Sequence, residues 1–262
     1  MNLEELLRAE PKFHQDASGA PYSWQVSVDV LSFIDGHVRE GSRTLEIGAG
    51  VSTVLFAIKG CTHVSIVPEE EETVRIKAFC REYGIPVDRL TFKIDRSDHC
   101  LPQLELADLD LVLIDGAHGF PIPFLDWHYT AERLKVGGLL IIDDTQLWTG
   151  DTLKMFLMDE PEWELVVDYV PRSVVFRKVK EGGCGKNESA QPYVVRQTLD
   201  LLFGTYPEYV EYTRPYLPPD LYKAKEKSLA FRAFRARRFA RNVISQVLPG
   251  PVKAWLKALL GR

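Results

Sequence analysis

Cysteine is scarce in this sequence, and the four residues present are widely separated. They are Cys61, Cys80, Cys100 and Cys184. No CxxC pair occurs, so the spacing suggests neither a zinc knuckle nor a disulfide framework. The longest apolar runs, such as "GGLLII", are far too short to span a bilayer. The start, "MNLEELLRAEPKF", lacks the apolar core of a signal peptide. These absences predict a cytoplasmic protein with reduced thiols.

Positive charge is scarce except near the C-terminal end. The 262 residues carry 32 Lys and Arg against 37 Asp and Glu, a net charge of −5. Residues 222–262 alone hold eleven basic residues and one acid, which leaves the remainder at −15. A basic tail on an acidic body is an asymmetry that calls for an explanation of its own.

Short β-branched runs alternate with longer helical stretches over the middle of the chain. The candidate strands are residues 43–48, 62–67, 90–94, 109–115, 137–143, 163–169 and 173–179. Apolar strands that alternate with helices indicate a parallel sheet covered on both faces. The last two candidates are joined only by "VPR", which is too short for a helical crossover and predicts an antiparallel hairpin.

The predicted fold is therefore α/β, a Rossmann-like doubly wound sheet of seven strands that is mostly parallel and ends in an antiparallel hairpin. We expect three regions. Residues 1–42 read as an N-terminal helical cover, and 43–180 as the ligand-binding domain. Residues 181–262 read as a Gly-rich linker followed by a basic helical C-terminal extension.

The stretch "TLEIGAGVST", residues 44–53, lies where the first strand of the sheet ends. Gly48 and Gly50 allow a sharp turn and a close approach of the backbone to a ligand. The free N–H groups of the helix that follows would face a polar or anionic group. A dinucleotide fingerprint requires a third glycine, but Thr53 stands at that position, which disfavours a nicotinamide dehydrogenase.

Five βα units followed by a hairpin, together with "LEIGAGVST", resemble the class I S-adenosylmethionine-dependent methyltransferases. The resemblance implies that the loop cradles the methionine part of the cofactor, and that Glu46 holds its amino group directly or through water. The loop residues assigned to the cofactor in this way are Glu46, Gly48, Ala49, Gly50, Ser52 and Thr53.

The second strand ends in "SIVPEEEE", where the sequence departs from that family. Related enzymes carry an acid at the position of Val67, which binds the ribose hydroxyls, and valine cannot do this. Glu69 is the candidate replacement. Its alternative role is to begin the next helix with a favourable charge.

After the third strand, "DRSDHCLPQL" resembles the adenine-binding segment of catechol O-methyltransferases. The resemblance assigns Ser97 and Asp98 to the adenine, and a carboxylate can accept a hydrogen bond from an exocyclic amine. The alternative is that Asp98 caps the short helix that follows.

Acidic residues follow both the fourth and the fifth strand. Because these strands are neighbours in the predicted sheet, Asp115, Asp143 and Asp144 should converge, and such a group needs a proton or a cation. Oxygen ligands suit Mg²⁺. "DDTQLWTG" is similar to the metal-binding "DNTLWNG" of caffeoyl-CoA O-methyltransferases, although Asp144 replaces the usual asparagine. "LIDGAH" is also common in macrocin-O-methyltransferase-like bacterial enzymes.

His118 lies three residues after Asp115, where the catechol enzymes carry a catalytic lysine. Neutral imidazole is suited to removing a proton from a hydroxyl near pH 7, so His118 is the predicted general base, with Asp115 beside it. The alternative is an ordinary loop histidine. Phe120, Phe124 and Trp127 are candidates for the wall of an apolar substrate pocket, or for helix packing against the sheet.

The tail contains two segments of helical character. "FRAFRARRFARNVIS" carries five arginines, and "VKAWLKALL" places its apolar residues on one helical face. Docking on the acidic body or on a second subunit is the first interpretation, and peripheral contact with a membrane surface is the second. The acidic remainder argues against a nucleic-acid partner.

The predicted function is S-adenosylmethionine-dependent O-methylation of a hydroxyl on a small molecule or sugar, with Mg²⁺ as a candidate second cofactor. One alternative is a non-catalytic cofactor-binding or scaffold protein recruited by its tail, which Val67 favours. Another is an aminopropyl transferase of the same fold. The acceptor is not readable from the sequence, because variable loops build the pockets of this fold.

Overall fold

The computed structural model describes most of the chain and divides it into two compact units. The described residues are 1–16, 18–187, 190–206, 209, 214–216 and 219–226. The first unit is Met1–Gly185 and the second is Lys186–Arg262. The boundary between them falls within the Gly-rich stretch 181–192.

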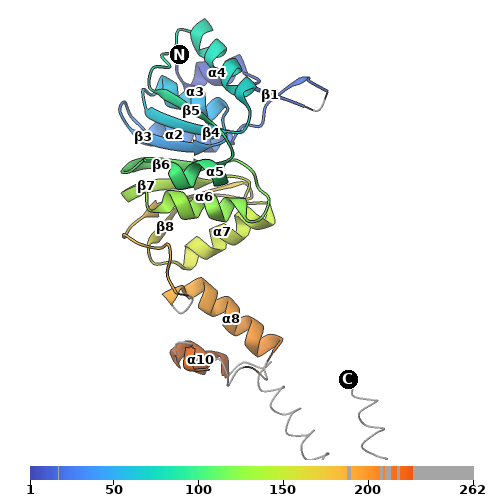
Figure 1. Ribbon diagram of the computed structural model, residues 1–262, viewed down its shortest axis with the longest axis vertical. Coiled ribbons are helices and arrows are strands. Elements are labelled where there is room, and N and C mark those ends of the chain that lie inside the picture. Colours follow the sequence, from blue (N-terminus) through green and yellow to red (C-terminus); the bar gives the residue numbers. More distant parts are fainter. Residues whose placement is uncertain (17, 188–189, 207–208, 210–213, 217–218, 227–262) are drawn as a thin grey trace, which may run out of the picture. The chain divides into compact units, whose positions relative to one another are not determined.

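The first unit is organised around the predicted seven-stranded sheet (Figure 1). In spatial order its strands are β5 (Leu90–Ile94), β4 (Thr62–Val67), β3 (Arg43–Ile47), β6 (Leu109–Ile114), β7 (Leu134–Ile142), β9 (Ser173–Lys178) and β8 (Trp163–Tyr169). The first five strands run parallel to one another, while β9 is antiparallel to both β7 and β8. The predicted fold class, including the terminal hairpin, is confirmed.

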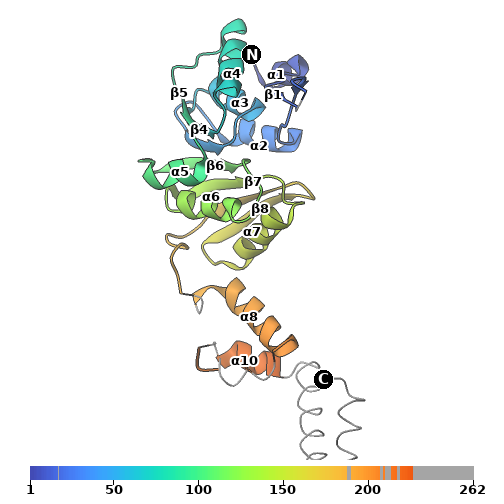
Figure 2. The same cartoon turned by 45° about the vertical axis from the view of Figure 1, so that its right-hand side comes forward.

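Helices cover both faces of the sheet, as two views show (Figures 1 and 2). One layer is α1 (Leu3–Ala9), α2 (Val28–His37), α3 (Val51–Ile58) and α4 (Glu70–Glu82). The other is α5 (Ser97–Cys100), the 3-10 turn η1 (Leu101–Gln103), α6 (Ile122–Ala131) and α7 (Trp148–Asp159). Buried leucine, isoleucine and valine side chains of the first layer share a core with alternate residues of β6, β7 and β9.

The register of the parallel strands aligns their carboxyl ends. Ile47 of β3 pairs with Ile114 of β6, which pairs with Ile142 of β7. The ladder continues one step further, because the Asp115 N–H donates to the Ile47 carbonyl and the Asp143 N–H donates to the Ile114 carbonyl. The strand order reverses between β4 and β6, on either side of β3, and ligands bind at such switch points in open α/β sheets.

The N-terminal segment is helical only in part. Between α1 and α2 lies a small hairpin of β1 (His14–Gln15) and β2 (Pro21–Tyr22). Its turn is held by Asp16, whose side chain accepts hydrogen bonds from the backbone N–H groups of Ser18 and Ala20. Asp and Gly in "DASGAPY" favour a turn over a helix, which explains the difference from the predicted helical cover.

The second unit contains α8 (Pro192–Gly204), the 3-10 turn η4 (Arg214–Tyr216) and α10 (Pro219–Glu226). Its small core consists of Val195, Leu199, Leu202, Phe203 and Tyr222. The two tail segments that suggested docking or membrane contact, 231–245 and 252–260, lie outside the described residues. Within the described part of the chain, no helix combines the length and the hydrophobicity that a bilayer crossing requires.

Candidate active site

The loop after β3 closes tightly against the loop after β6. Gly48 has a positive φ of 108°, and a Cβ added there would lie 2.4 Å from the Asp115 carbonyl oxygen. Conversely, a Cβ on Gly116 would lie 2.6 Å from the Ile47 side chain. Gly48 is thus fixed both by its backbone conformation and by the approach of Asp115. The predicted glycine turn and the first predicted acid are therefore immediate neighbours.

Glu46 is a buried carboxylate that is satisfied by the helix following it. The Ser52 hydroxyl donates to one oxygen, and the Thr53 hydroxyl donates to the other at 2.6 Å. Thr53 also accepts the Gly50 N–H at 2.9 Å, which closes the loop at the start of α3. His63 Nε2 lies 3.4 Å from Glu46. Two hydroxyl donors and the neighbouring His63 thus hold this carboxylate in place just before the glycine loop.

The N-terminal hairpin is fastened to the glycine loop through His14, which the sequence did not single out. Its Nε2 lies 3.0 Å from the Ala49 carbonyl, and its Nδ1 accepts the Trp24 N–H at 3.2 Å. These contacts fix a neutral tautomer with the proton on Nε2. Burial lowers the pKa of His14, although the bond to Ala49 opposes that shift.

The end of β4 presents Val67 fully buried, and the acids lie in the helix that follows. Glu69 is exposed at the N-cap of α4, and its side chain makes no capping bond. Glu72, one turn on, lies 3.9 Å from His14, and burial followed by the charge of Glu69 raises its pKa to about 7. Both acids thus lie near the cover and the glycine loop.

The predicted adenine segment forms α5. Ser97 is buried at its first position, while the Asp98 carboxylate accepts two hydrogen bonds from Arg96, at 3.0 and 2.9 Å. Asp126, in the neighbouring α6, is fully buried, and within the described structure neither of its oxygens has a hydrogen-bond partner of good geometry. Burial raises the pKa of Asp126 to about 7, and the Ser97 hydroxyl opposes the shift.

His118 and Asp144 form a dyad at the carboxyl ends of β6 and β7. His118 Nε2 lies 2.9 Å from Asp144 Oδ2, and both side chains are partly accessible to solvent. The Thr149 hydroxyl donates to the His118 carbonyl at 2.6 Å and fixes the loop. Ligand atoms of Asp115, His118 and Asp144 all lie within 4.8 Å of one another. Burial raises the pKa of Asp115 well above its usual range, and neighbouring carboxylates raise it further.

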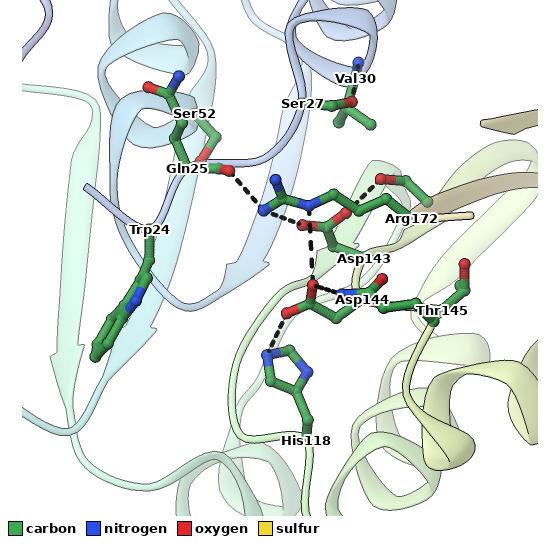
Figure 3. A network of polar contacts seen from close by, with 12 residues as sticks. Trp24, Gln25, Ser27, Val30, Ser52, His118, Asp143, Asp144, Thr145 and Arg172 are labelled. Atoms are coloured by element: carbon green, nitrogen blue, oxygen red, sulfur yellow. Dashed lines mark hydrogen bonds and ion pairs between the residues drawn. The ribbon is translucent and has the colours of Figure 1, made fainter. Parts of the chain in front are cut away.

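Asp143 is held by residues at the β8–β9 turn, and it lies beside Arg172 (Figure 3). The Ser173 hydroxyl donates to its Oδ1, and Arg172 Nη2 lies 3.4 Å from its Oδ2. Burial raises the pKa of Asp143, while Ser173 and Arg172 oppose that shift. Of the three acids proposed as metal ligands, the structure therefore gathers Asp115 and Asp144 with His118, and leaves Asp143 engaged elsewhere.

Aromatic side chains border the dyad. Phe120 and Trp148, which are 70% and 67% exposed, have ring centroids 6.2 Å apart. Trp24 of the cover is also exposed. Trp127, in contrast, is buried and packs edge-to-face on Phe156, so its role is in the core. Exposed rings beside a polar dyad can hold an apolar part of an acceptor.

Sequence reasoning missed His14, Asp126 and Arg172. His14 and Arg172 lie far along the chain from the groups they contact, so no local spacing connects them. Arg172 had a weak signal, because it sits in the short "VPR" turn of a hairpin whose neighbour in the sheet ends at the acids. Asp126 also had a weak signal in the sequence, because it is a lone acid within the apolar run "PIPFLDW".

The chain matches a protein-family model and is similar to several solved structures. Residues 45–145 match a family described as a methyltransferase domain. The chain is similar to the cofactor-bound protein Rv0187 from MTB, with 18% identity and a TM-score of 0.52 over 68% of this chain and 90% of the other. It is also similar to a putative rRNA-methylase from Clostridium thermocellum, with 16% identity and a TM-score of 0.51 over 61% and 99%.

No match to a curated protein was found. At these identities the solved structures establish the fold, and the family match covers less than half of the chain. The finer resemblance to catechol, caffeoyl-CoA and macrocin enzymes stays a prediction. At the coarser level, the part of the chain that matches the methyltransferase-domain family lies within a Rossmann-like fold of seven strands.

Proposed function

We propose that this protein is an S-adenosylmethionine-dependent methyltransferase that acts on a hydroxyl of a small molecule or sugar, with His118 as general base. The observation that carries the proposal is the His118–Asp144 contact of 2.9 Å at the strand ends next to the glycine loop. The methyltransferase family match over residues 45–145 supports the choice of cofactor.

The residues present suit this cofactor. A carboxylate at Glu46 matches an ammonium group, and the glycine loop at the switch point has little side-chain bulk. Exposed Glu69 can take the ribose role that Val67 cannot, and Ser97 lies at the adenine position of the resemblance. Asp98 suits that role less well, because Arg96 occupies its carboxylate.

The dyad explains how a hydroxyl would be activated. Asp144 accepts a hydrogen bond from His118 Nε2–H, so His118 Nδ1 is left as the basic nitrogen. His118 Nδ1 removes the proton of the acceptor hydroxyl, and Asp144 stabilises the imidazolium that results. When bound, S-adenosylmethionine supplies a methyl group on a sulfonium. The loop contacts at Thr149 hold His118 in place through this step.

A divalent ion at Asp115, His118 and Asp144 is the alternative to a histidine base, and direct titration with Mn²⁺ decides between the two. Asp115 and Asp144 would hold it with oxygen atoms and His118 with nitrogen, where it would lower the pKa of a bound hydroxyl. A mixed set of two carboxylates and one imidazole suits Mn²⁺ or Zn²⁺ better than the Mg²⁺ predicted from carboxylates alone. In that form His118 is a ligand and is not free to act as the base.

Calorimetric titration with S-adenosylhomocysteine, followed by turnover on a panel of phenols and sugars, tests the proposal. We expect micromolar binding. His118→Ala and Asp144→Asn should lose at least about 100-fold in kcat with unchanged cofactor affinity. His128→Ala, an exposed histidine of α6, is the matched control and should retain full turnover.

No binding at millimolar ligand would refute the proposal and favour a scaffold role. Binding with full activity of both dyad variants would instead refute only the assignment of the base.

A further inference from the structure

Arg172 occupies a position that the fold fixes rigidly. It is the last residue of the β8–β9 turn, and its N–H donates to the Tyr169 carbonyl at 2.9 Å. Its carbonyl accepts the Thr145 N–H at 2.8 Å, and the Thr145 hydroxyl donates to the Pro171 carbonyl at 2.9 Å. The turn is thereby fastened to the chain just after β7. The backbone that carries the Arg172 guanidinium is therefore fixed beside the acids.

The side chain of Arg172 connects three parts of the molecule (Figure 3). Its Nη2 donates to the Gln25 carbonyl of the N-terminal cover at 2.7 Å and lies 3.4 Å from Asp143 Oδ2. Its Nε lies 3.8 Å from Asp144 Oδ1. One guanidinium thus spans the cover, the buried acid after β7 and the acid of the dyad.

The contacts of Arg172 matter because several carboxylates lie close together at this edge of the sheet. Asp115, Asp143 and Asp144 follow adjacent strands, and Asp143 is 2% exposed. Neighbouring carboxylates repel one another unless a proton or a cation compensates their charge. The guanidinium keeps its charge at any physiological pH. Arg172 therefore supplies, from the chain itself, the positive charge for which the sequence suggested a metal ion.

We propose that Arg172 is the resident cation of this acid cluster, in the place of a divalent ion, and that it tethers the N-terminal cover to the cluster through Gln25. The proposal concerns the site of the proposed function but does not depend on methyl transfer. It predicts that the intact protein binds divalent ions weakly at Asp115, His118 and Asp144, since the guanidinium lies beside Asp144 and repels them.

Mn²⁺ titration followed by electron paramagnetic resonance, without cofactor or acceptor, tests this directly. Arg172→Met should bind Mn²⁺ at least tenfold more tightly than the unmodified protein, while Arg172→Lys should resemble the latter. Arg177→Met is the matched control, because Arg177 lies on β9, is 42% exposed against 41% for Arg172, and pairs with Glu164 at the surface. It should not change Mn²⁺ affinity.

Equal or weaker Mn²⁺ binding by Arg172→Met would overturn the proposal. So would tight binding by the unmodified protein that the variant leaves unaltered. If Arg172→Met fails to fold, the double variant Arg172→Met/Asp143→Asn removes both charges of the pair and keeps Asp115, His118 and Asp144. It should show the same gain in Mn²⁺ affinity.

Hydrogen exchange tests the tether separately. Arg172→Met should increase amide exchange across residues 21–27, and Arg177→Met should not. Unchanged exchange in that segment would overturn the tether. Failure of the methyltransferase proposal would be recognised independently, as a lack of S-adenosylhomocysteine binding by the unmodified protein.

Discussion

Strand β3 and the loop after β7 each contain an almost fully buried carboxylate, and the two are stabilised differently. Glu46, 1% exposed, accepts hydroxyl hydrogen bonds from Ser52 and Thr53. Asp143, 2% exposed, accepts one hydroxyl from Ser173 and pairs with the Arg172 guanidinium. Hydroxyl groups and the His63 imidazole surround the first carboxylate, whereas the second faces a guanidinium.

This difference separates two tasks. A carboxylate held only by neutral donors can still attract a cationic ligand, such as the amino group of the proposed cofactor. A carboxylate that is already paired with a guanidinium is structural, and it holds the hairpin turn and the cover in place. Gly48 contacts Asp115 of the loop after β6, the strand that lies between β3 and β7, so a change at this contact should affect both regions.

The largest expected effect is that of Gly48→Ala. A methyl group there would lie 2.4 Å from the Asp115 carbonyl oxygen at a φ of 108°, so strain and overpacking together should cost roughly 3–5 kcal/mol of unfolding free energy. Urea denaturation measures the loss. Gly36→Ala in α2 is the control, because a Cβ there meets nothing within 4 Å, and helix propensity should stabilise it by about 0.5–1 kcal/mol.

A loss below 1 kcal/mol for Gly48→Ala would mean that the two loops do not approach each other as described.

The same comparison explains which parts of the molecule were predictable. Glu46, Gly48, Ser52 and Thr53 lie within eight residues, so one strand–turn–helix motif contains both the acid and its donors. The seven strands and the terminal hairpin followed from alternating apolar runs and a short link between the last two strands, because both are local signals. The convergence of Asp115 with Asp144 followed from strand neighbours.

The remainder of the site depends on tertiary contacts. Asp143 finds its donors about 30 residues along the chain, at Ser173 and Arg172, and Arg172 reaches Gln25 across 147 positions. The side-chain direction of Asp143 was likewise unreadable, because a strand end fixes where an acid lies but not which of its neighbours it bonds. The N-terminal hairpin was not predicted for a different reason. Its strands have two residues each, which is too short to show an alternating pattern.

Asp126 extends the comparison to a buried carboxylate that has neither strong donors nor a cation. Burial raises its pKa to about 7 from an ordinary value near 4, so the folded protein holds a proton that the unfolded chain releases. Stability should therefore fall as pH rises from about 4 to 7 and stay low above it. Asp126→Asn removes this loss and should be the more stable protein at pH 8, by about 2–4 kcal/mol.

Thermal unfolding at pH 5 and pH 8 checks this, because the advantage of Asp126→Asn should grow with pH. Asp88→Asn, at an exposed position, should show no such trend. An advantage that is equal at both pH values would show that Asp126 is ionised in the folded protein, with Ser97 or another donor compensating its charge.

The smallest expected change in stability, and the most selective change in binding, is that of Glu46→Gln. Glutamine keeps the shape but offers one acceptor oxygen for the two hydroxyls of Ser52 and Thr53, which should cost about 1 kcal/mol of unfolding free energy. It also removes the charge proposed to hold the ammonium group. Affinity for S-adenosylhomocysteine should fall at least about tenfold, since hydrogen bonds to charged groups contribute about 1.5–3 kcal/mol.

Methylthioadenosine, which lacks the amino-acid part, is the matched ligand and should bind the variant and the unmodified protein equally. Parallel calorimetric titrations decide the point, because equal losses for both ligands would place Glu46 in the support of the loop and not in contact with the amino group.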